Sequence, residues 1–316
     1  MDRGRTQAGL VLPRRAMLGQ GAGRDHTGQV SGIRRGERIL VTQSNRCGSR
    51  IQQDDAMNDI DEFRRRMRVE GYCLFPRMVG PGSLARLRTE IPAAQEYCRS
   101  WQIRNGVEVG MQGAAHHIVG RGAAIDDFLF ALHLDDCIAD HFGGPYILNS
   151  FGAVDNADHR GGTYGHGMRF HRDVRTFSAD LPLMINMLLM VDDFTVENGA
   201  TRLVPGSHRV AERPSDEELE RRSVRAIGSA GSILLFDSNL WHAAAPNITP
   251  RPRMALTLTF TRPFFKQQMD YPRMLGEDFP PNDRVRQVLG YDSRVPANHD
   301  EWYQPPERRK YKPGQG

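Results

Sequence analysis

Amphipathic helices are predicted where the patterned part of the chain begins, close to Met57. Apolar residues there recur three and four positions apart, with arginines on the opposite face, and Gly71 ends the segment. A short strand is predicted over residues 72–75. Pro81 then begins a second helix, because proline is favoured in the first helical turn. A further helical stretch is predicted over residues 125–142.

Beyond residue 146 the pattern changes to short apolar runs bounded by Gly, Pro, Asn and Asp, which indicates β-strands. In residues 254–261, Ala255 and three threonines alternate with larger apolar side chains, as in a strand with one more deeply buried face. The strands predicted after the helices cover residues 146–154, 183–191, 200–204, 232–236 and 254–261. Early helices and late strands together predict an α+β domain with a β-sandwich or barrel at its centre.

The two ends of the chain lack this patterning. Residues 1–56 are rich in Gly, Arg, Gln and Ser and show no sustained period. They are expected to be a disordered basic extension, or the product of a start codon assigned too far upstream. Residues 57–304 are expected to form a single domain, in which a helix over residues 283–290 belongs to a segment that covers the core or the pocket. Residues 305–316 are expected to be a solvated tail.

Composition and charge narrow the function classes. The chain is 39% hydrophobic and 25% charged, typical of a soluble globular protein, and has no apolar run of the roughly 18 residues that span a bilayer. Its net charge of +4 divides into +5 for residues 1–56, with ten Arg and five Asp or Glu, and 4 − 5 = −1 for the rest. A nearly neutral body does not indicate a surface for nucleic-acid phosphates, so neither a nucleic-acid nor a membrane partner is expected.

Cysteine usage favours a reducing, cytoplasmic setting. Cys47, Cys73, Cys98 and Cys137 lie far apart and form no C-x-x-C pair, so neither a zinc knuckle nor a disulfide framework is indicated. No pair of arginines is followed by the apolar stretch of an export signal. No coiled-coil heptad is evident either, which leaves monomer and homodimer both open.

The sharpest chemical feature is the segment His171-Arg172-Asp173. In an extended segment, residues two apart face the same side, so His171 and Asp173 can present an imidazole and a carboxylate to one metal ion. An H-x-D segment alone is common. His242, however, follows the strand predicted at residues 232–236 and can supply a third ligand. Two neutral imidazoles and one carboxylate form the facial triad of non-haem iron oxygenases, which leaves open positions for a cosubstrate and dioxygen.

An iron site of this kind also needs a group that holds an organic acid. Arg253 stands at the head of the strand predicted at residues 254–261, and its guanidinium can bind a distal carboxylate through two hydrogen bonds. Arg251 is the competing candidate. Because it is flanked by Pro250 and Pro252, we expect it in the preceding turn and favour Arg253.

The order of these residues resembles the phytanoyl-CoA dioxygenase family. The resemblance rests on the H-x-D segment, on residues 197–200 (Glu-Asn-Gly-Ala) leading to residues 205–208 (Pro-Gly-Ser-His), and on His242 with the Pro-Asn pair and the arginine that follow it. It extends over about residues 59–264. The family's members are iron(II)- and 2-oxoglutarate-dependent oxygenases. The resemblance therefore implies a mainly β core, the cupin-like jelly roll or double-stranded β-helix, flanked by N-terminal helices.

The resemblance also implies roles for individual residues. His171, Asp173 and His242 would be the catalytic iron ligands, and Arg253 would bind the C5 carboxylate of 2-oxoglutarate. Iron(II) would then act with 2-oxoglutarate and dioxygen as cosubstrates. The implied reaction is hydroxylation of a small-molecule metabolite with release of succinate and carbon dioxide. The carboxylate of Asp173 disfavours halogenation, since related halogenases carry a small residue there.

The sequence leaves several residue assignments open. The contact to the C1 side of 2-oxoglutarate is unassigned, and Asn149, Asn156 and Asn186 are all candidates. Ala244 stands where some family members place a serine that helps to hold the cosubstrate. His208 is expected to be a turn histidine rather than a fourth ligand.

Two other functions compete with the oxygenase. One is a non-catalytic jelly-roll protein that binds metal and 2-oxoglutarate, and the other is a zinc hydrolase with the same three ligands.

Overall fold

The computed structural model of the chain describes residues 38–40, 60–157 and 168–315. These all belong to one compact unit, Gly36–Gly316. The expected disordered extension, residues 1–56, lies outside the described residues except for residues 38–40. Those three residues form a strand, which the unpatterned sequence around them does not predict.

Amphipathic spacing explains the helices that precede the sheets. Helix α1 buries Phe63 and Met67, and its acidic first turn and basic last turn both complement the helix dipole. Helix α2 has proline in its first turn, as the sequence predicts. The helices of the described residues are α1 (Ile60–Val69), α2 (Pro81–Arg104), α3 (Ala123–Phe130), α4 (Asp135–Phe142), α5 (Asp216–Arg222), α6 (Tyr271–Leu275), α7 (Asp283–Val288) and α8 (His299–Trp302).

The helical stretch expected over residues 125–142 is two helices. Helices α3 and α4 are separated at residues 131–134, where Leu132 and Leu134 adopt left-handed backbone with φ of 46° and 62°. Leucine rarely adopts this conformation, so nothing in the residue types predicts the break. The periodicity therefore identifies the helical content but misses the turn.

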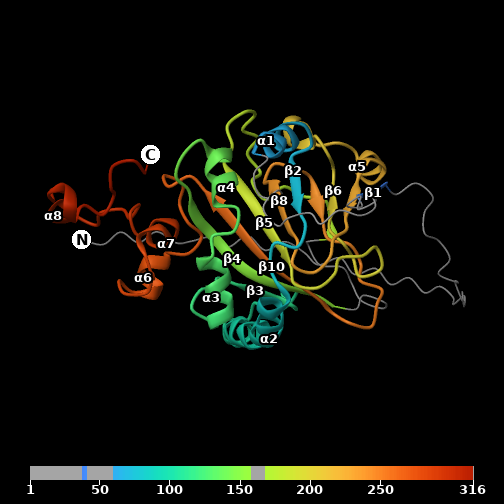
Figure 1. The fold of residues 1–316 in the computed structure, drawn as a ribbon, viewed down its shortest axis with the longest axis horizontal. Coiled ribbons are helices and arrows are strands. Elements are labelled where there is room, and N and C mark those ends of the chain that lie inside the picture. The colour runs from blue at the N-terminus through green and yellow to red at the C-terminus, as the bar shows by residue number, and fades with distance from the viewer. Residues whose placement is uncertain (1–37, 41–59, 158–167, 316) are drawn as a thin grey trace, which may run out of the picture. The chain divides into compact units, whose positions relative to one another are not determined.

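The strands form two sheets that make up the jelly roll (Figure 1). They are β1 (Arg38–Leu40), β2 (Tyr72–Phe75), β3 (Ala114–His116), β4 (Ile147–Asn156), β5 (Met184–Met190), β6 (Arg202–Leu203), β7 (Val224–Ala226), β8 (Ile233–Asp237), β9 (His242–Ala243) and β10 (Arg253–Thr261). One sheet has the order β1-β7-β6-β9 and the other β2-β8-β5-β10-β4-β3. Every pairing in the larger sheet is antiparallel.

Side chains of the central strands alternate between the two faces of the larger sheet, so the hydrophobic core consists of two clusters. On β5, Ile185, Met187 and Leu189 pack on the face that the helices cover. Leu188 and Met190 point the other way and pack with Leu203 of β6 and Ala226 of β7, between the two sheets. Two of the three methionines of this strand, Met187 and Met190, are therefore core residues. Asn186 shares the inner face with Leu188 and Met190, which directs its amide into the jelly roll.

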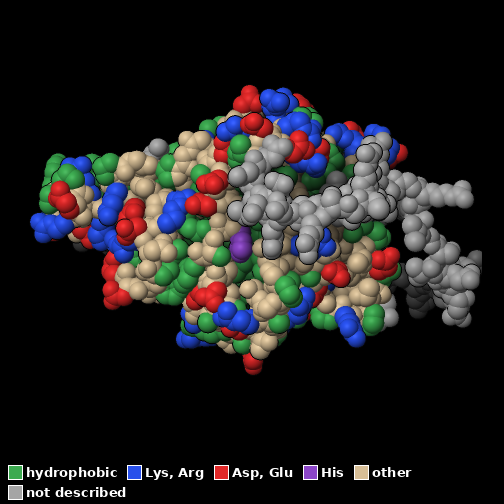
Figure 2. Space-filling view, in the orientation of Figure 1, with side chains coloured by type: hydrophobic (Ala, Val, Ile, Leu, Met, Phe, Trp, Pro, Cys, Tyr) green, Lys and Arg blue, Asp and Glu red, His purple; other side chains and the backbone are tan. Residues whose placement is uncertain are grey.

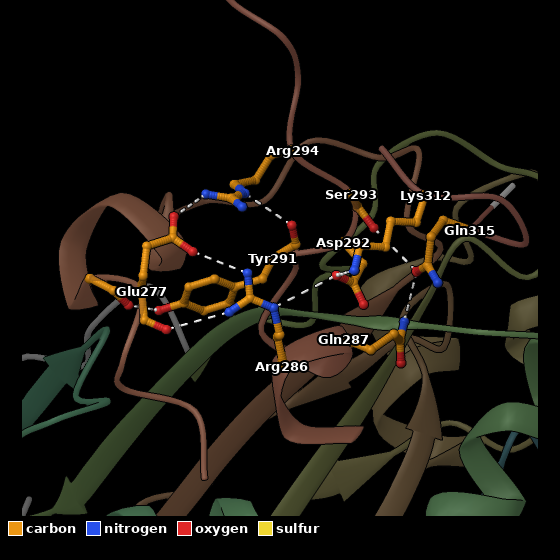
Figure 3. Close-up of polar contacts among 10 residues, drawn as sticks. Glu277, Arg286, Gln287, Tyr291, Asp292, Ser293, Arg294, Lys312 and Gln315 are labelled. Carbon is orange, nitrogen blue, oxygen red and sulfur yellow. Dashed lines mark hydrogen bonds and ion pairs between the residues drawn. The ribbon is translucent and has the colours of Figure 1, made fainter. Parts of the chain in front are cut away.

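The last part of the chain covers one edge of the larger sheet. Helix α7 coincides with most of the expected helix at residues 283–290, and Gln287 donates to the carbonyl oxygen of Tyr146 at 3.1 Å. Glu277 forms ion pairs with Arg286 and Arg294, as Figure 3 shows.

The end of the chain differs from the expected solvated tail. Most of residues 305–310 are exposed, but Tyr311 pairs with Ser293 and the side chain of Gln315 is buried. Gln315 accepts a hydrogen bond from Gln287 at 3.0 Å (Figure 3). A tail composed mainly of polar residues is held here by specific hydrogen bonds, which composition does not predict.

No helix among the described residues combines the length and apolar character needed to cross a bilayer. Figure 2 shows acidic and basic side chains intermixed over the face it presents. This intermixing agrees with the nearly neutral charge of residues 57–316.

Candidate metal centre

Backbone pairing brings together the two segments that carry the candidate ligands. The amide of His171 donates to the carbonyl oxygen of His242 at 2.9 Å, and the amide of His242 donates back at 3.0 Å. The amide of Asp173 donates to the carbonyl oxygen of Ser238 at 3.1 Å. Because the segment is extended, the side chains of His171 and Asp173 face the same side, as the sequence predicts.

Three side chains converge at this point. One potential ligand atom from each of His171, Asp173 and His242 lies within 4.8 Å of the others. The Nε2 atom of His171 is 3.5 Å from Oδ1 of Asp173, and Nε2 of His242 is 3.6 Å from Oδ2. No other group of three His, Cys, Asp or Glu residues converges in this way in the described part of the chain.

Backbone carbonyls fix the orientation of both imidazoles. Nδ1 of His171 lies 2.8 Å from the carbonyl oxygen of Arg169, and Nδ1 of His242 lies 2.9 Å from that of Leu240. A carbonyl oxygen only accepts hydrogen bonds, so each Nδ1 carries the hydrogen. In the neutral rings the lone pairs are then on the Nε2 atoms, which face Asp173.

Asn186 orients the carboxylate. Its Nδ2 donates to Oδ2 of Asp173 at 2.7 Å from the inner face of β5. Asn186 is only 4% exposed, and its Oδ1 has no hydrogen-bond partner among the described residues. A carboxylate held by an amide on a central strand has little freedom to turn away, which suits a ligand.

The charges within the group favour an ionised carboxylate. Burial opposes ionisation of Asp173, but His242, His171 and the Asn186 hydrogen bond together outweigh it and hold its pKa at about 2. Burial also lowers the pKa of His242, which favours the neutral ring that a metal ligand requires. Two imidazole nitrogens and one carboxylate fit iron(II), which accepts this mixed nitrogen and oxygen donor set.

Arg253 begins β10 and is buried between the sheets. It is 4% exposed, and its guanidinium lies 3.7 Å from the ring centroid of Phe194. Its Nε and Nη1 atoms have no hydrogen-bond partner among the described residues. Burial lowers its pKa to about 10, although Asp192 and Asp155 oppose that shift. A buried, incompletely hydrogen-bonded guanidinium fits an anionic cosubstrate.

The competing arginine has a different environment. Arg251 is exposed, in the bend that precedes β10, and its carbonyl oxygen accepts a hydrogen bond from Asn247 at 2.7 Å. Of the two arginines, Arg253 alone is buried, which agrees with its position on the strand.

The three candidate asparagines have distinct contacts. Asn149 donates to the carbonyl oxygen of Lys266 at 3.2 Å, and Asn156 donates to that of Ala245 at 3.1 Å. Only Asn186, of the three, is hydrogen-bonded to a candidate metal ligand, Asp173. The sequence alone does not show which of these asparagines lies at the site, because their hydrogen-bond partners are far from them along the chain.

His208 lies apart from this group. It is 9% exposed, and its ring packs against Gly71, where an added Cβ would come within 2.9 Å of the imidazole Cγ. Its neighbour Ser207 accepts a hydrogen bond from the amide of Trp241 at 2.9 Å. The Pro-Gly-Ser-His motif therefore supports the strand that leads to His242, which agrees with a turn histidine.

A separate cavity of about 320 Å³ lies beside α2 and the edge strand β3. Its walls are mostly aromatic and sulfur-containing side chains, with two histidines and an arginine. The lining residues are Tyr97, Cys98, Trp101, Gln102, Met111, His116, His117, Arg121, Met269 and Met274. None of the three metal-ligand candidates belongs to it.

Comparisons with known proteins agree with this geometry. The model of the family described as Phytanoyl-CoA dioxygenase (PhyH) matches residues 67–255. Uncharacterized protein Rv1501 of Mycobacterium tuberculosis is 44% identical over 178 residues, which cover 56% of this chain and 63% of that protein. Ectoine dioxygenase of Halomonas elongata is 29% identical over 38% of this chain and 44% of its own length. The chain thus aligns with less than two thirds of either relative.

Solved structures show the same fold. The non-heme alpha ketoglutarate dependent epimerase SnoN from nogalamycin biosynthesis superposes with a TM-score of 0.51 at 16% identity, over 64% of this chain and 80% of SnoN. At that identity the likeness concerns the fold alone. Because the family match covers more than half of the chain and includes His171, Asp173, His242 and Arg253, the chain belongs to the phytanoyl-CoA dioxygenase family.

Proposed function

We propose that this chain is an iron(II)- and 2-oxoglutarate-dependent dioxygenase that hydroxylates a small-molecule metabolite and releases succinate and carbon dioxide. The observation that carries the proposal is the convergence of His171, Asp173 and His242 within 4.8 Å, with both Nε2 lone pairs directed inward. Family membership supports the same chemistry.

His171, Asp173 and His242 would hold the iron, while Arg253 would bind the C5 carboxylate of 2-oxoglutarate. Iron(II), when bound, supplies the position at which dioxygen reacts with the oxo acid. Arg253 suits its role because a bidentate guanidinium contact between the sheets is shielded from water, which strengthens it. Asn186 would keep the carboxylate of Asp173 in place throughout turnover.

A small organic substrate is supported by the relatives. The printed name of one of them, ectoine dioxygenase, refers to a small molecule. The nearly neutral charge of residues 57–316 does not favour a strongly anionic substrate such as a CoA ester. We therefore propose an uncharged or weakly charged metabolite.

The test is succinate formation from 2-oxoglutarate by purified, iron-loaded protein under air. His171→Ala and Asp173→Ala are expected to reduce succinate to background. His299→Ala and Asp216→Ala, at exposed positions of α8 and α5, should leave it unchanged. Succinate production retained in both ligand variants would contradict the proposal. Binding of iron and 2-oxoglutarate without succinate under any substrate would instead favour the non-catalytic alternative, and preference for zinc without 2-oxoglutarate binding would favour the hydrolase.

A further inference from the structure

The residue between the two first ligands points away from the metal site. Arg172 alternates with His171 and Asp173, so its side chain lies on the opposite face of the segment. It is only 8% exposed. Its guanidinium donates to three carbonyl oxygens of the loop that follows β6: Ser207 at 2.7 Å, Ala211 at 3.3 Å, and Val210.

The residue before the third ligand meets Arg172 there. Trp241 directly precedes His242, and the Arg172 guanidinium lies 4.9 Å from the centroid of its ring. The amide of Trp241 donates to Oγ of Ser207 at 2.9 Å, while the carbonyl oxygen of Ser207 accepts from Arg172. Arg172, Trp241 and Ser207 therefore contact one another behind the three ligands.

Arginine suits this position better than any other basic residue. Three carbonyl acceptors and an aromatic face together require a planar group with several donors, and a lysine ammonium cannot stack in that way. Arg172 forms no ion pair with a carboxylate of the described residues. Asp237 raises the pKa of Arg172 only through longer-range electrostatic attraction. Its buried charge is thus stabilised by carbonyl dipoles and by ring faces, which sets its position tightly.

We propose that Arg172 and Trp241 act as positioning residues: together they form a clamp that fixes the distance between the His171–Asp173 segment and His242. The clamp lies behind the ligands and would touch neither metal nor substrate. It joins the two segments through side chains, in addition to the hydrogen bonds of their backbone amides. Without it, the segments would be held by backbone hydrogen bonds, between His171 and His242 and from the amide of Asp173 to Ser238, and by the side chain of Asn239. The inference rests on the proposed function, because it assigns a purpose to contacts around that metal site.

The test is an anaerobic titration of the full chain with cobalt(II), followed through the visible d–d bands. Arg172→Leu is expected to weaken cobalt affinity by on the order of 10- to 100-fold and to shift the bands. Arg172→Lys should recover part of the affinity, since it keeps the charge and donors but not the stacking. Arg213→Ala is the matched control, because Arg213 also lies against Trp241, at 5.4 Å, but is exposed and paired with Asp216.

The band positions separate positioning from stability. A residue that only stabilises the fold would lower the unfolding temperature and leave the spectrum and affinity of the folded protein unchanged. That result for Arg172→Leu would overturn the inference. If Arg172→Leu does not fold, Trp241→Leu decides: weaker affinity with shifted bands supports the clamp, and wild-type values for both overturn it. Failure of the wild type itself to bind cobalt would instead contradict the proposed function, and the clamp with it.

Discussion

His171 and His242 are held in register by two backbone hydrogen bonds, at 2.9 and 3.0 Å, before any side-chain contact is considered. The candidate metal ligands are therefore brought together by backbone pairing and do not need a metal to assemble them. A site formed in this way binds metal without a large folding cost, and the binding free energy appears as added stability of the native state.

Metal should therefore stabilise the protein through Asp173. At cobalt(II) concentrations of 100 times the dissociation constant, the wild type is expected to gain about 2.7 kcal/mol of unfolding free energy. Asp173→Ala should lose most of this gain, because it removes the charged ligand. Thermal unfolding under argon, with and without metal, measures the difference. Equal stabilisation of both proteins would mean that the metal binds elsewhere.

The amide of Asn186 should matter for metal affinity. Asn186→Leu removes the hydrogen bond to Asp173 while keeping a similar volume, and is expected to weaken cobalt binding by about 10-fold or more. Leu188→Ala, on the same face of β5, serves as a control that costs stability without touching the carboxylate. The hydrogen bond has no role in ligand positioning if both variants bind cobalt as the wild type does.

The close contact between Gly71 and His208 gives a test of packing. Gly71 has φ of 83° and an added Cβ would overlap the His208 ring, so Gly71→Ala should cost about 2–4 kcal/mol of unfolding free energy. Gly143 also has left-handed backbone, with φ of 65° and ψ of 28°, but open space around it. Gly143→Ala should therefore cost only about 1–2 kcal/mol, which is the cost of the backbone conformation alone. Urea denaturation measures both, and equal losses would show that the His208 contact adds nothing.

His208 should also make stability depend on pH. Burial lowers its pKa from 6.5 to about 4, so the folded state favours the neutral ring. Its contribution is present above about pH 6.5 and is lost as the pH falls towards 4, by on the order of 1–3 kcal/mol. His208→Gln should show a flatter decline in unfolding free energy between pH 7 and about 4.5. Parallel curves for the two proteins would exclude His208 as the source.

The sequence predicts what depends on local periodicity. Helix α1, strand β2 and the face alternation of β10 follow directly from spacing, and so does the pairing of His171 with Asp173 on one side. The break between α3 and α4 depends on two leucines in left-handed backbone, which only their tertiary surroundings explain. Strand β1 is equally hidden, since its partner β7 lies far along the chain.

The residues that pack around the candidate ligands could not be predicted from local periodicity. Asn186 acts on Asp173 across 13 positions, and Arg172 meets Trp241 across 241 − 172 = 69 positions. In each case the residue type is compatible with an ordinary core or surface position. Only the packing of the two sheets shows which partners these side chains meet.

The most direct test of the account is an anaerobic titration of the apo-protein with iron(II) and then 2-oxoglutarate, followed through the weak visible charge-transfer band. The wild type should develop the band. Arg253→Ala should need about 10- to 150-fold more 2-oxoglutarate, because a charge-assisted contact is lost, while Arg251→Ala should match the wild type. A folded, iron-loaded wild type that gives no band at saturating 2-oxoglutarate would contradict the proposed chemistry, and equal affinity in Arg253→Ala would contradict the assigned cosubstrate site.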